Sequence, residues 1–452
     1  QKYHQIEVPM RGWARPERWM PVIFFLGGFY LFLLALSQFG DGISPLQMLP
    51  QRTKLKSDYD YAEGVTVKKF TLILNSTRYE TMEIENILTN DKSATFEERL
   101  HANVDYKAPP KIILSWDAGH GPENLGGCPD WNCEFTYDRS KVEKASVVLA
   151  TSDGFTRRNR DQIIVFYSQE SPKNMPINVN PKDYFNVSLG FRHDTAGASP
   201  YGYTVKLAKR RNIKEMVNSS RLKGKSKAAA WFVSHCFTNS KREDLVVQMQ
   251  KYIPVDIFGG CLQGKSCPRG EKCEDMLDED YHFYLAFENS ICTDYITEKV
   301  WNQGYGRDIV PIVMKRSVAD NRLPPNSFLA IDDYDTVQDL AERMKFLMNN
   351  KTAYSQKIKD HSCSEMFNWR RDYATIYLNG EQHDILERPW GFCQLCRIAW
   401  ENPKTEQVID DFNKWWEGSC EEDGATVARI LSHTEARENE KEHMIRANRI
   451  TV

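Results

Sequence analysis

The sequence lacks the features that mark nucleic-acid-binding proteins and repeat proteins. Its 452 residues contain no arginine-rich run, no zinc-finger spacing, no internal repeat and no low-complexity tract. The formal net charge is only −3, so there is no excess of basic residues to form a face for nucleic acid. What is present is 41% hydrophobic and 12% aromatic residues, enough for sizeable buried cores. These figures predict a folded protein of two or three domain-sized units.

Eleven cysteines and four N-glycosylation sequons indicate a secretory protein. So many cysteines are typical of an oxidising compartment. Each sequon is a short tripeptide that also occurs by chance, but together with the cysteines they favour a secretory address. Because the cysteine count is odd, at least one thiol is left free or paired between chains. The sequons begin at Asn75, Asn186, Asn218 and Asn350.

One uncharged run, Trp19 to Phe39, lies near the start of the sequence. About 20 apolar residues, at a rise of about 1.5 Å each, span the core of a bilayer. A cleaved signal peptide is the alternative, because Ala35-Leu-Ser37 is a small-residue pattern, but the run exceeds the roughly 7–15 apolar residues of such peptides. We therefore expect a cytosolic tail at 1–18, a transmembrane signal-anchor at 19–39 and a lumenal stem at 40–108.

Short apolar runs alternate with helix-like stretches from Lys111 onward, and this alternation predicts parallel sheets with helices on both faces. A helix is expected over Val337–Asn349, where apolar residues fall at helical spacing and Thr336 with Asp339 could form a capping box. The predicted strands form two series: Lys111–Trp116, Ala145–Ala150 and Gln162–Tyr167, then Ala228–Ser234, Val255–Phe258, Phe283–Phe287 and Ile309–Met314.

Two such series predict two α/β domains with a cleft between them, at 109–225 and 226–402. Ligands of parallel sheets bind at the carboxyl ends of the strands. The remaining segment, 403–452, is expected to be a tail, and its part Glu435–Arg449 is interpreted as a charged, solvated helix.

The densest group of candidate binding residues lies between Phe287 and Lys299. A predicted strand ends at Phe287, a polar loop follows, and a helix is expected to begin at Thr297. Free N–H groups and the helix dipole at such a start favour anions, and Lys299 adds the full positive charge that a diphosphate would require. Glu298 suits a ribose diol better than a phosphate. From these residues alone, an ordinary helix with a Glu–Lys surface pair is an equally good interpretation.

Three Asp-x-Asp triplets, which begin at Asp58, Asp278 and Asp333, raise a metal-dependent alternative, because carboxylates hold divalent cations. A few such triplets are expected by chance in an acidic chain. Asp58 lies in the expected stem, and Asp278 precedes a predicted strand, at the wrong end for a ligand site in a parallel sheet. We assign no metal to them, and indirect stimulation by a divalent cation stays an open alternative.

The block from Phe287 to Lys299 resembles the donor-binding signature of the α1,3/4-fucosyltransferase family. The resemblance extends from about Ile112 to Trp400, and it implies two facing Rossmann-like domains of the type called GT-B, with GDP-fucose bound in the C-terminal one. The pattern departs from the family at an extra segment, Gln356–Glu365, which contains Cys363, our candidate for the odd thiol. The further matching motifs are Phe191–Tyr203, Trp231–Arg242, Asp256–Cys261, Pro325–Leu329 and Phe367–Tyr373.

The resemblance assigns the donor-binding residues. It implies that Arg242 and Lys299 contact the diphosphate, and Arg242 suits this role because its fork can hold two oxygens at once. Tyr295 and Glu298 would hold the nucleoside and fucose side, and Asn289 would lie near the sugar. The alternative for each is a packing or surface residue.

The resemblance also assigns Glu170 as the catalytic base. This residue follows the predicted strand that ends at Tyr167, so it lies in a loop at a carboxyl edge. A base is needed to remove the acceptor's hydroxyl proton as the new bond forms. Direct attack assisted by one carboxylate gives inversion, by analogy with single-displacement glycosidases. Arg192 and Asp194 are expected on the acceptor side.

Family members tie their N-terminal cysteines to a C-terminal Cys-x-x-Cys. The resemblance therefore implies that Cys128 and Cys133 pair with Cys393 and Cys396, in an order left open, and that these bridges clamp the two domains together. A zinc site is the alternative, but an oxidising lumen favours disulfides. Further bridges could form among Cys236, Cys261, Cys267, Cys273 and Cys292, with a connectivity that the sequence does not determine.

Within the family, the cysteine cluster from Cys261 to Cys273 is similar to that of invertebrate core-type enzymes. Together with the expected signal-anchor at 19–39, this resemblance implies a single-pass type II Golgi membrane enzyme that transfers L-fucose from GDP-fucose to O3 of the innermost N-acetylglucosamine of glycoprotein N-glycans. Lewis-type fucosylation of lactosamine antennae and a non-catalytic glycan-binding protein are the alternatives. The expected partners are GDP-fucose, an N-glycan acceptor and the membrane, with no bound cofactor and no nucleic acid.

Overall fold

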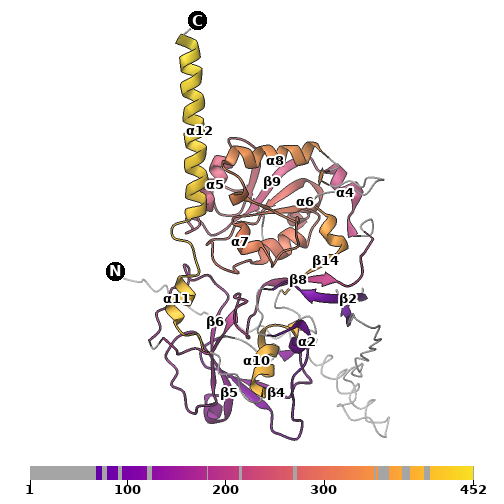
Figure 1. Ribbon diagram of the computed structural model, residues 1–452, viewed down its shortest axis with the longest axis vertical. Coiled ribbons are helices and arrows are strands. Elements are labelled where there is room, and N and C mark those ends of the chain that lie inside the picture. Colours follow the sequence, from indigo (N-terminus) through magenta and orange to yellow (C-terminus); the bar gives the residue numbers. More distant parts are fainter. Residues whose placement is uncertain are drawn as a thin grey trace, which may run out of the picture. The chain divides into compact units, whose positions relative to one another are not determined.

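The computed structural model (Figure 1) describes residues 68–73, 79–89, 94–119, 125–180, 182–212, 216–267, 272–350, 353–354, 366–378, 387–401 and 408–450. All of these residues belong to one compact unit, Asp58–Val452. The predicted membrane span at 19–39, Asp58, Asn75 and the segment Gln356–Glu365 with Cys363 lie outside the described residues. Within the described ranges, no helix is long and apolar enough to cross a membrane.

The N-terminal sheet has five parallel strands in the order β4-β3-β5-β6-β7. Strands of such sheets are covered on both faces, so they appear in the sequence as continuous apolar runs, as in Ala145–Ala150. The three strands predicted in this part of the chain are confirmed. The bounds are β3 (Lys111–Ser115), β4 (Cys133–Thr136), β5 (Ala145–Ala150), β6 (Ile163–Ser168) and β7 (Val187–Gly190).

The C-terminal sheet also has five parallel strands, in the order β10-β9-β11-β12-β13. Helices α5 (Arg242–Met249) and α8 (Val337–Asn349) bury apolar side chains against it. Helix α8 has the predicted bounds, and its predicted capping box between Thr336 and Asp339 is present. The strands are β9 (Lys227–Phe232), β10 (Val255–Phe258), β11 (Tyr281–Leu285), β12 (Val310–Val313) and β13 (Leu329–Ala330).

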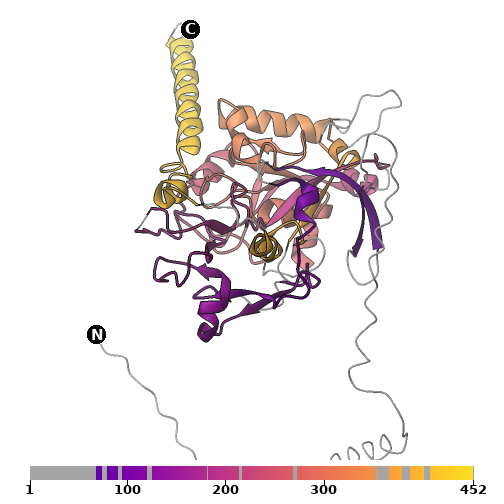
Figure 2. The ribbon, with the colours of Figure 1, turned by 60° about the horizontal axis from the view of Figure 1, so that its bottom comes forward.

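A third, antiparallel sheet joins segments from distant parts of the chain in the order β1-β2-β8-β14. It contains β1 (Lys68–Ile73), β2 (Tyr79–Ile87), β8 (Gly202–Leu207) and β14 (Tyr373–Tyr377). Figure 2 shows β1 and β2 as a curved indigo ribbon. The predicted stem at 40–108 therefore needs correction from Lys68 onward, since Ile84 and Ile87 are buried in this sheet and α2 (Phe96–Arg99) follows it.

Helix α10 (Gly391–Trp400) returns to the N-terminal sheet, where Leu395 and Ile398 are buried against Val147 and Leu189. The disulfides Cys128–Cys393 and Cys133–Cys396 hold it there and confirm the predicted pairing. Their effect differs from the prediction: they attach α10 to the N-terminal sheet and do not clamp two domains. The C-terminal domain predicted at 226–402 thus ends before this helix.

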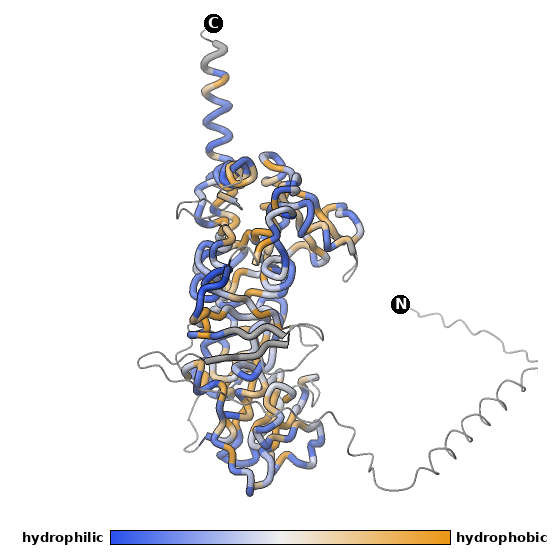
Figure 3. The backbone as a smooth tube through the Cα atoms, turned by 90° about the vertical axis from the view of Figure 1, so that its right-hand side faces the viewer, coloured by the Kyte–Doolittle hydropathy of each residue, from blue (hydrophilic) through white to orange (hydrophobic). Residues whose placement is uncertain are grey.

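The predicted tail at 403–452 is folded in large part. Helix α11 (Phe412–Glu417) buries Phe412 and Trp416 beside Phe166 of the N-terminal sheet. Helix α12 (Ala425–Ile450) then buries Val427 in the core of the C-terminal sheet. Figure 3 shows the rest of α12 as mostly hydrophilic, in agreement with the charged helix expected over Glu435–Arg449.

The remaining helices of the described ranges are short and lie in the connections. They are η4 (Arg139–Lys144), α4 (Ser219–Gly224), η5 (Lys272–Asp275), α6 (Met276–Glu279), η6 (Lys299–Tyr305), α7 (Arg316–Ala319), η7 (Ile331–Asp333) and η8 (Asn368–Arg371).

Candidate active site

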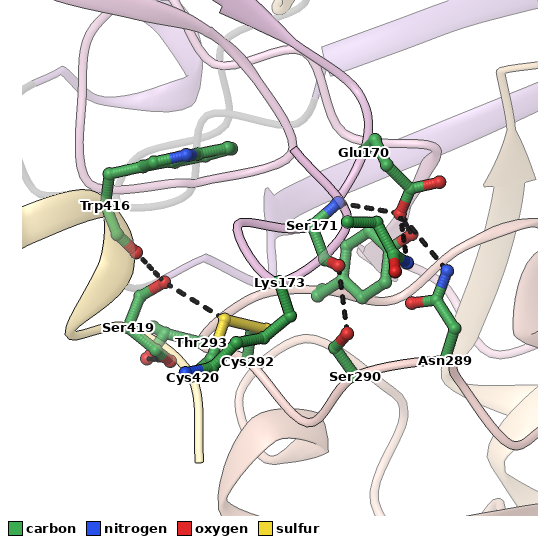
Figure 4. Close-up of a disulfide and its surroundings, with 12 residues drawn as sticks. Glu170, Ser171, Lys173, Asn289, Ser290, Cys292, Thr293, Trp416, Ser419 and Cys420 are labelled. Atoms are coloured by element: carbon green, nitrogen blue, oxygen red, sulfur yellow. Dashed lines mark hydrogen bonds between the residues drawn. A yellow bond between two sulfur atoms is a disulfide. The ribbon is translucent and has the colours of Figure 1, made fainter. Parts of the chain in front are cut away.

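Glu170 lies in the loop after β6 and receives four hydrogen bonds on one carboxylate oxygen. Its Oε1 accepts from the backbone N–H of Ser171 at 2.8 Å and from the side-chain amide of Asn174 at 3.3 Å. It also accepts from the hydroxyl of Tyr295 at 2.6 Å. The fourth bond comes from the amide of Asn289 at 3.2 Å (Figure 4). Within the described part of the chain, no hydrogen bond reaches Oε2. The bonds to Oε1 thus fix the orientation of the carboxylate, and the lone pairs of Oε2 stay available to accept a proton.

The surroundings of Glu170 keep its carboxylate ionised. Burial alone would raise the pKa of Glu170, but the hydrogen bonds from Tyr295, Ser171 and Asn289 outweigh it and hold the pKa below the usual 4.5. Burial, together with the nearby carboxylates of Glu288 and Glu170, raises the pKa of Tyr295, so that its hydroxyl stays a donor. An ionised carboxylate with one unoccupied oxygen is suited to accept a proton at neutral pH.

Asn289 and Tyr295 connect Glu170 to the C-terminal sheet, since both lie in the loop that follows β11. The Tyr295 ring packs edge-on against Phe191 with ring centroids 4.8 Å apart. Asn289 is 7% exposed, and its Oδ1 is buried without a hydrogen bond from any described residue. Loops from the two parallel sheets therefore meet at Glu170. The structure brings this predicted base together with Asn289 and Tyr295, which are predicted on the sugar side of the donor.

Lys299 begins the short helix η6, in a network of carboxylates. Its Nζ lies 2.9 Å from Glu288 Oε2 and 3.3 Å from Glu298 Oε1, and it donates to the Thr297 hydroxyl at 2.7 Å. Burial would lower the pKa of Lys299, but Glu288 and Glu298 raise it above its usual value, so the cation is retained. Glu288, which sequence reasoning did not single out, is 7% exposed and holds Thr297 as well. The Glu–Lys surface pair weighed from the sequence is therefore a largely buried network.

The predicted helix start at Thr297 is shifted in the structure. The helix begins at Lys299 and is π-helical through Tyr305. π-helical turns are rare and are often found at functional sites. The strand before this loop also ends at Leu285, earlier than the predicted Phe287. The predicted order of strand, polar loop and helix is otherwise confirmed.

Arg242 is buried at the start of α5, with 2% of its surface exposed. Its Nη1 donates to the carbonyl of Phe287 at 2.6 Å, and its Nη2 donates to the carbonyl of His235 at 2.7 Å. The planar fork thus holds together the two loops that follow β9 and β11. The phosphate contact that the family resemblance implies for Arg242 stays a prediction.

A pocket that is partly open to solvent lies at the carboxyl edge of the C-terminal sheet. Its polar lining includes Glu288, Tyr295 and Lys315, and the apolar lining includes Val313 and Val300. Lys315 lies two residues after the end of β12 and forms an ion pair with Glu421. The sequence analysis did not single out Lys315, although this residue directly follows the predicted strand Ile309–Met314 and ligands of parallel sheets bind at the carboxyl ends of strands.

Arg192 and Asp194 form an ion pair in the loop after β7. The Arg192 guanidinium stacks on the ring of Trp415 at 4.6 Å and donates to the Trp415 carbonyl at 2.9 Å. The indole N–H of Trp415 donates to Asp194 at 3.0 Å. No hydrogen bond joins this group directly to Glu170 among the described residues, although Phe191, next to Arg192, contacts Tyr295. The acceptor-side role of Arg192 and Asp194 stays a prediction.

The described acidic triplets take part in ion pairs. Asp278 bonds Arg307 at 3.1 Å, and Asp280 lies 2.7 Å from Lys227. Asp333 accepts from Arg316 at 2.6 Å. In the described ranges, no three His, Cys, Asp or Glu side chains are grouped so that they could hold a metal ion.

Three of the four sequons begin at described residues. Asn218 is exposed and caps α4 by accepting from the N–H of Arg221 at 3.0 Å. Asn186 and Asn350 are half-buried, and their side chains accept from the N–H groups of Ile164 and Ala353. Glycosylation at each of them stays a prediction.

Two family models match the chain over most of the described unit. The model "Fucosyltransferase, N-terminal" matches residues 108–202, and "Glycosyltransferase family 10 (fucosyltransferase) C-term" matches residues 222–415. These matches, over both sheets and the loops that meet at Glu170, define the class of a sugar transferase. The chain belongs to glycosyltransferase family 10, the fucosyltransferases, and is an α1,3-fucosyltransferase. The family predicted from the sequence is confirmed.

Two relatives with similar sequences agree with this assignment. Alpha-(1,3)-fucosyltransferase fut-1 of Caenorhabditis elegans is 48% identical over 385 residues, which cover 84% of this chain and 86% of that protein. Glycoprotein 3-alpha-L-fucosyltransferase A of Drosophila melanogaster is 33% identical over 334 residues, which cover 68% of this chain and 60% of that protein. A crystal structure of an α1,3-fucosyltransferase with GDP aligns to 70% of this chain and 97% of its own, at 15% identity and a TM-score of 0.41.

Proposed function

We propose that this enzyme transfers L-fucose from GDP-fucose to O3 of the innermost N-acetylglucosamine of glycoprotein N-glycans, with inversion at the anomeric carbon. The observation that carries the proposal is the carboxylate of Glu170. Four donors hold its Oε1, and Oε2 is left to accept a proton. An alcohol that attacks a sugar nucleotide needs such a base, positioned before the reaction begins.

In the proposed step, the acceptor's O3–H proton moves to Oε2 of Glu170 while O3 forms a bond to C1 of fucose. The bond between C1 and the diphosphate oxygen breaks at the same time, and GDP leaves with that electron pair. Attack from the side opposite the leaving group inverts C1, by analogy with single-displacement sugar hydrolysis. Asn289, whose Oδ1 is buried without a described partner, is well placed to accept a hydrogen bond from a sugar hydroxyl.

We propose that the diphosphate is bound at the carboxyl edge of the C-terminal sheet. Lys299 supplies a cation there that its carboxylate neighbours keep protonated. A diphosphate that approaches Lys299 would replace part of its interaction with Glu288, and Arg242 would hold the surrounding loops in place. Two five-stranded parallel sheets whose loops meet at Glu170 are compatible with the GT-B arrangement.

The proposed acceptor is the N-glycan core. It is supported by the resemblance of the Cys261–Cys273 cluster to core-type enzymes and by the Drosophila relative, whose name specifies a glycoprotein substrate. We further propose a type II Golgi membrane protein with a lumenal catalytic unit. Five disulfides among the described residues support an oxidising compartment, and they involve ten of the eleven cysteines.

The test is a linkage analysis of the products made from two defined acceptors and GDP-fucose. One acceptor is a paucimannose N-glycan with an unmodified core, and the other is a lactosamine antenna. We expect mass spectrometry to find fucose on O3 of the innermost N-acetylglucosamine, and NMR to find the anomeric configuration opposite to that of the donor. Fucose on the antenna alone, or retained configuration, would contradict the proposal.

A further inference from the structure

The segment Ile409–Thr426, here called the C-terminal strap, is anchored on the N-terminal sheet. Phe412 and Trp416 pack against Phe166 of β6, with ring centroids 4.7 Å and 4.9 Å apart. The backbone N–H of Ile409 donates to the carbonyl of Phe185 at 2.9 Å. The ring contacts attach the strap to β6, whose end carries the Glu170 loop, and the bond from Ile409 attaches it to the segment before β7.

The strap next contacts the Glu170 loop itself. The indole N–H of Trp416 donates to the carbonyl of Met175 at 3.2 Å, and Glu422 lies 3.0 Å from the ammonium of Lys173. The Glu422 side chain is 84% exposed, so this ion pair contributes little stability. The contact of Trp416, whose side chain is buried, therefore contributes more to the attachment than this ion pair does.

The strap then joins the loop of the C-terminal sheet that orients Glu170. A disulfide links Cys292 to Cys420 (Figure 4). On either side of it, the N–H of Thr293 donates to the carbonyl of Ser419 and the N–H of Glu421 donates to the carbonyl of Ile291, both at 2.8 Å. This attachment falls between Asn289 and Tyr295, the two residues of this loop that donate to Glu170.

The strap finally reaches the edge of the pocket. Glu421 pairs with Lys315 and accepts from the hydroxyl of Thr426 at 2.8 Å. Lys315 and Cys292 both line the pocket. At Gly424, with φ +59°, a Cβ atom would lie 2.7 Å from the Ser240 carbonyl oxygen, so only glycine permits the chain to pass this closely.

We propose that the C-terminal strap is a positioning element of the active site, which fixes the donor-side loop 289–295 against the Glu170 loop through the Cys292–Cys420 disulfide. This inference rests on the proposed role of Glu170 as the base. The strap is bonded to loops from both sheets, so it limits their relative movement. With the strap in place, Asn289 and Tyr295 donate to Oε1 and leave Oε2 for the acceptor.

The experiment compares two double variants in the full chain. Cys292→Ser/Cys420→Ser removes the strap disulfide, and Cys267→Ser/Cys273→Ser removes a disulfide with a sequence separation of only 6, outside the strap. Because a misplacement of about 1 Å can cost on the order of 100-fold in rate, we expect kcat of the strap variant to fall roughly 10- to 100-fold. We also expect the acid limb of its kcat/KM profile to move to higher pH, as donors to Glu170 withdraw, and the control variant to keep both properties.

A milder variant covers the case in which the double substitution prevents folding. Glu421→Gln keeps the shape of the side chain and the disulfide but weakens the pair with Lys315, and it should lower kcat several-fold with a shift of the acid limb in the same direction. Wild-type kcat and pH profile in a folded strap variant, or an equal loss in the control variant, would overturn the inference. Glu170→Gln is measured alongside: if it is fully active, the proposed base role fails, whatever the strap variants show.

Discussion

Replacing Tyr295 by phenylalanine removes the shortest of the four hydrogen bonds to Glu170, at 2.6 Å, and leaves the aromatic ring against Phe191. The Tyr295 hydroxyl favours the ionised carboxylate. In the native enzyme the pKa of Glu170 lies below 4.5, so activity is lost only when the pH falls through that low value. Without the hydroxyl, fewer hydrogen bonds offset the effect of burial, which raises the pKa, so the pKa of Glu170 must rise.

The size of this shift follows from the strength of the lost bond. A hydrogen bond to a charged group contributes about 1.5–3 kcal/mol. At about 1.36 kcal/mol per pKa unit, this corresponds to roughly one to two units. Glu170 is only half-buried and solvent screens part of the interaction, so we expect the lower end, about one unit.

The assay is the pH dependence of kcat/KM for GDP-fucose, whose acid limb reports the base in the free enzyme. Tyr354→Phe is the control, because its buried hydroxyl donates to the carbonyl of His282 at 2.6 Å, in the same half of the molecule. We expect the acid limb to move up by about one unit in Tyr295→Phe and to stay unchanged in Tyr354→Phe. An unmoved or lowered limb in folded Tyr295→Phe would refute this reasoning.

Two further substitutions test the donor site and the buried ion pair between Arg322 and Asp294. Lys299→Ala removes the cation proposed to bind the diphosphate, so calorimetry should find the Kd for GDP-fucose raised roughly 10- to 100-fold, and an unchanged Kd would exclude that contact. Arg322→Met leaves the buried carboxylate of Asp294, which also accepts from the N–H of His193, without its ion-pair partner. Urea unfolding should then show a loss of about 3–5 kcal/mol, and a loss below about 1 kcal/mol would contradict the importance of this pair.

Local patterns in the sequence predicted much of the two parallel sheets. Ala145–Ala150 and Val255–Phe258 are strands with the predicted bounds, because strands buried on both faces are continuous apolar runs. Helix α8 was predicted with its cap for a similar reason, since helical spacing and the capping box depend only on neighbouring residues. The family resemblance assigns Glu170, Asn289 and Tyr295 to one site, but it does not predict the hydrogen bonds that Asn289 and Tyr295 donate to Glu170.

What the sequence did not predict depends on contacts between distant residues. The strap was interpreted as a tail because charged residues separate its few apolar ones, and Phe412 and Trp416 find their partners only in the folded sheet. The Cys292–Cys420 disulfide spans 128 residues, and no local pattern indicates it. The resemblance assigns Arg242 to the diphosphate, whereas the two carbonyls to which it donates belong to loops that only the fold brings to it.

The central claim is that Glu170 removes the acceptor's proton, and Glu170→Gln tests it most directly. The amide keeps the shape of the side chain but cannot accept the proton, and general-base catalysis contributes roughly 10²- to 10⁴-fold to rate. We therefore expect the kcat for transfer to fall by that factor while the Kd for GDP-fucose, measured on the same preparation, stays within about threefold. A kcat within tenfold of the native enzyme, or an equal loss of donor binding, would contradict the account.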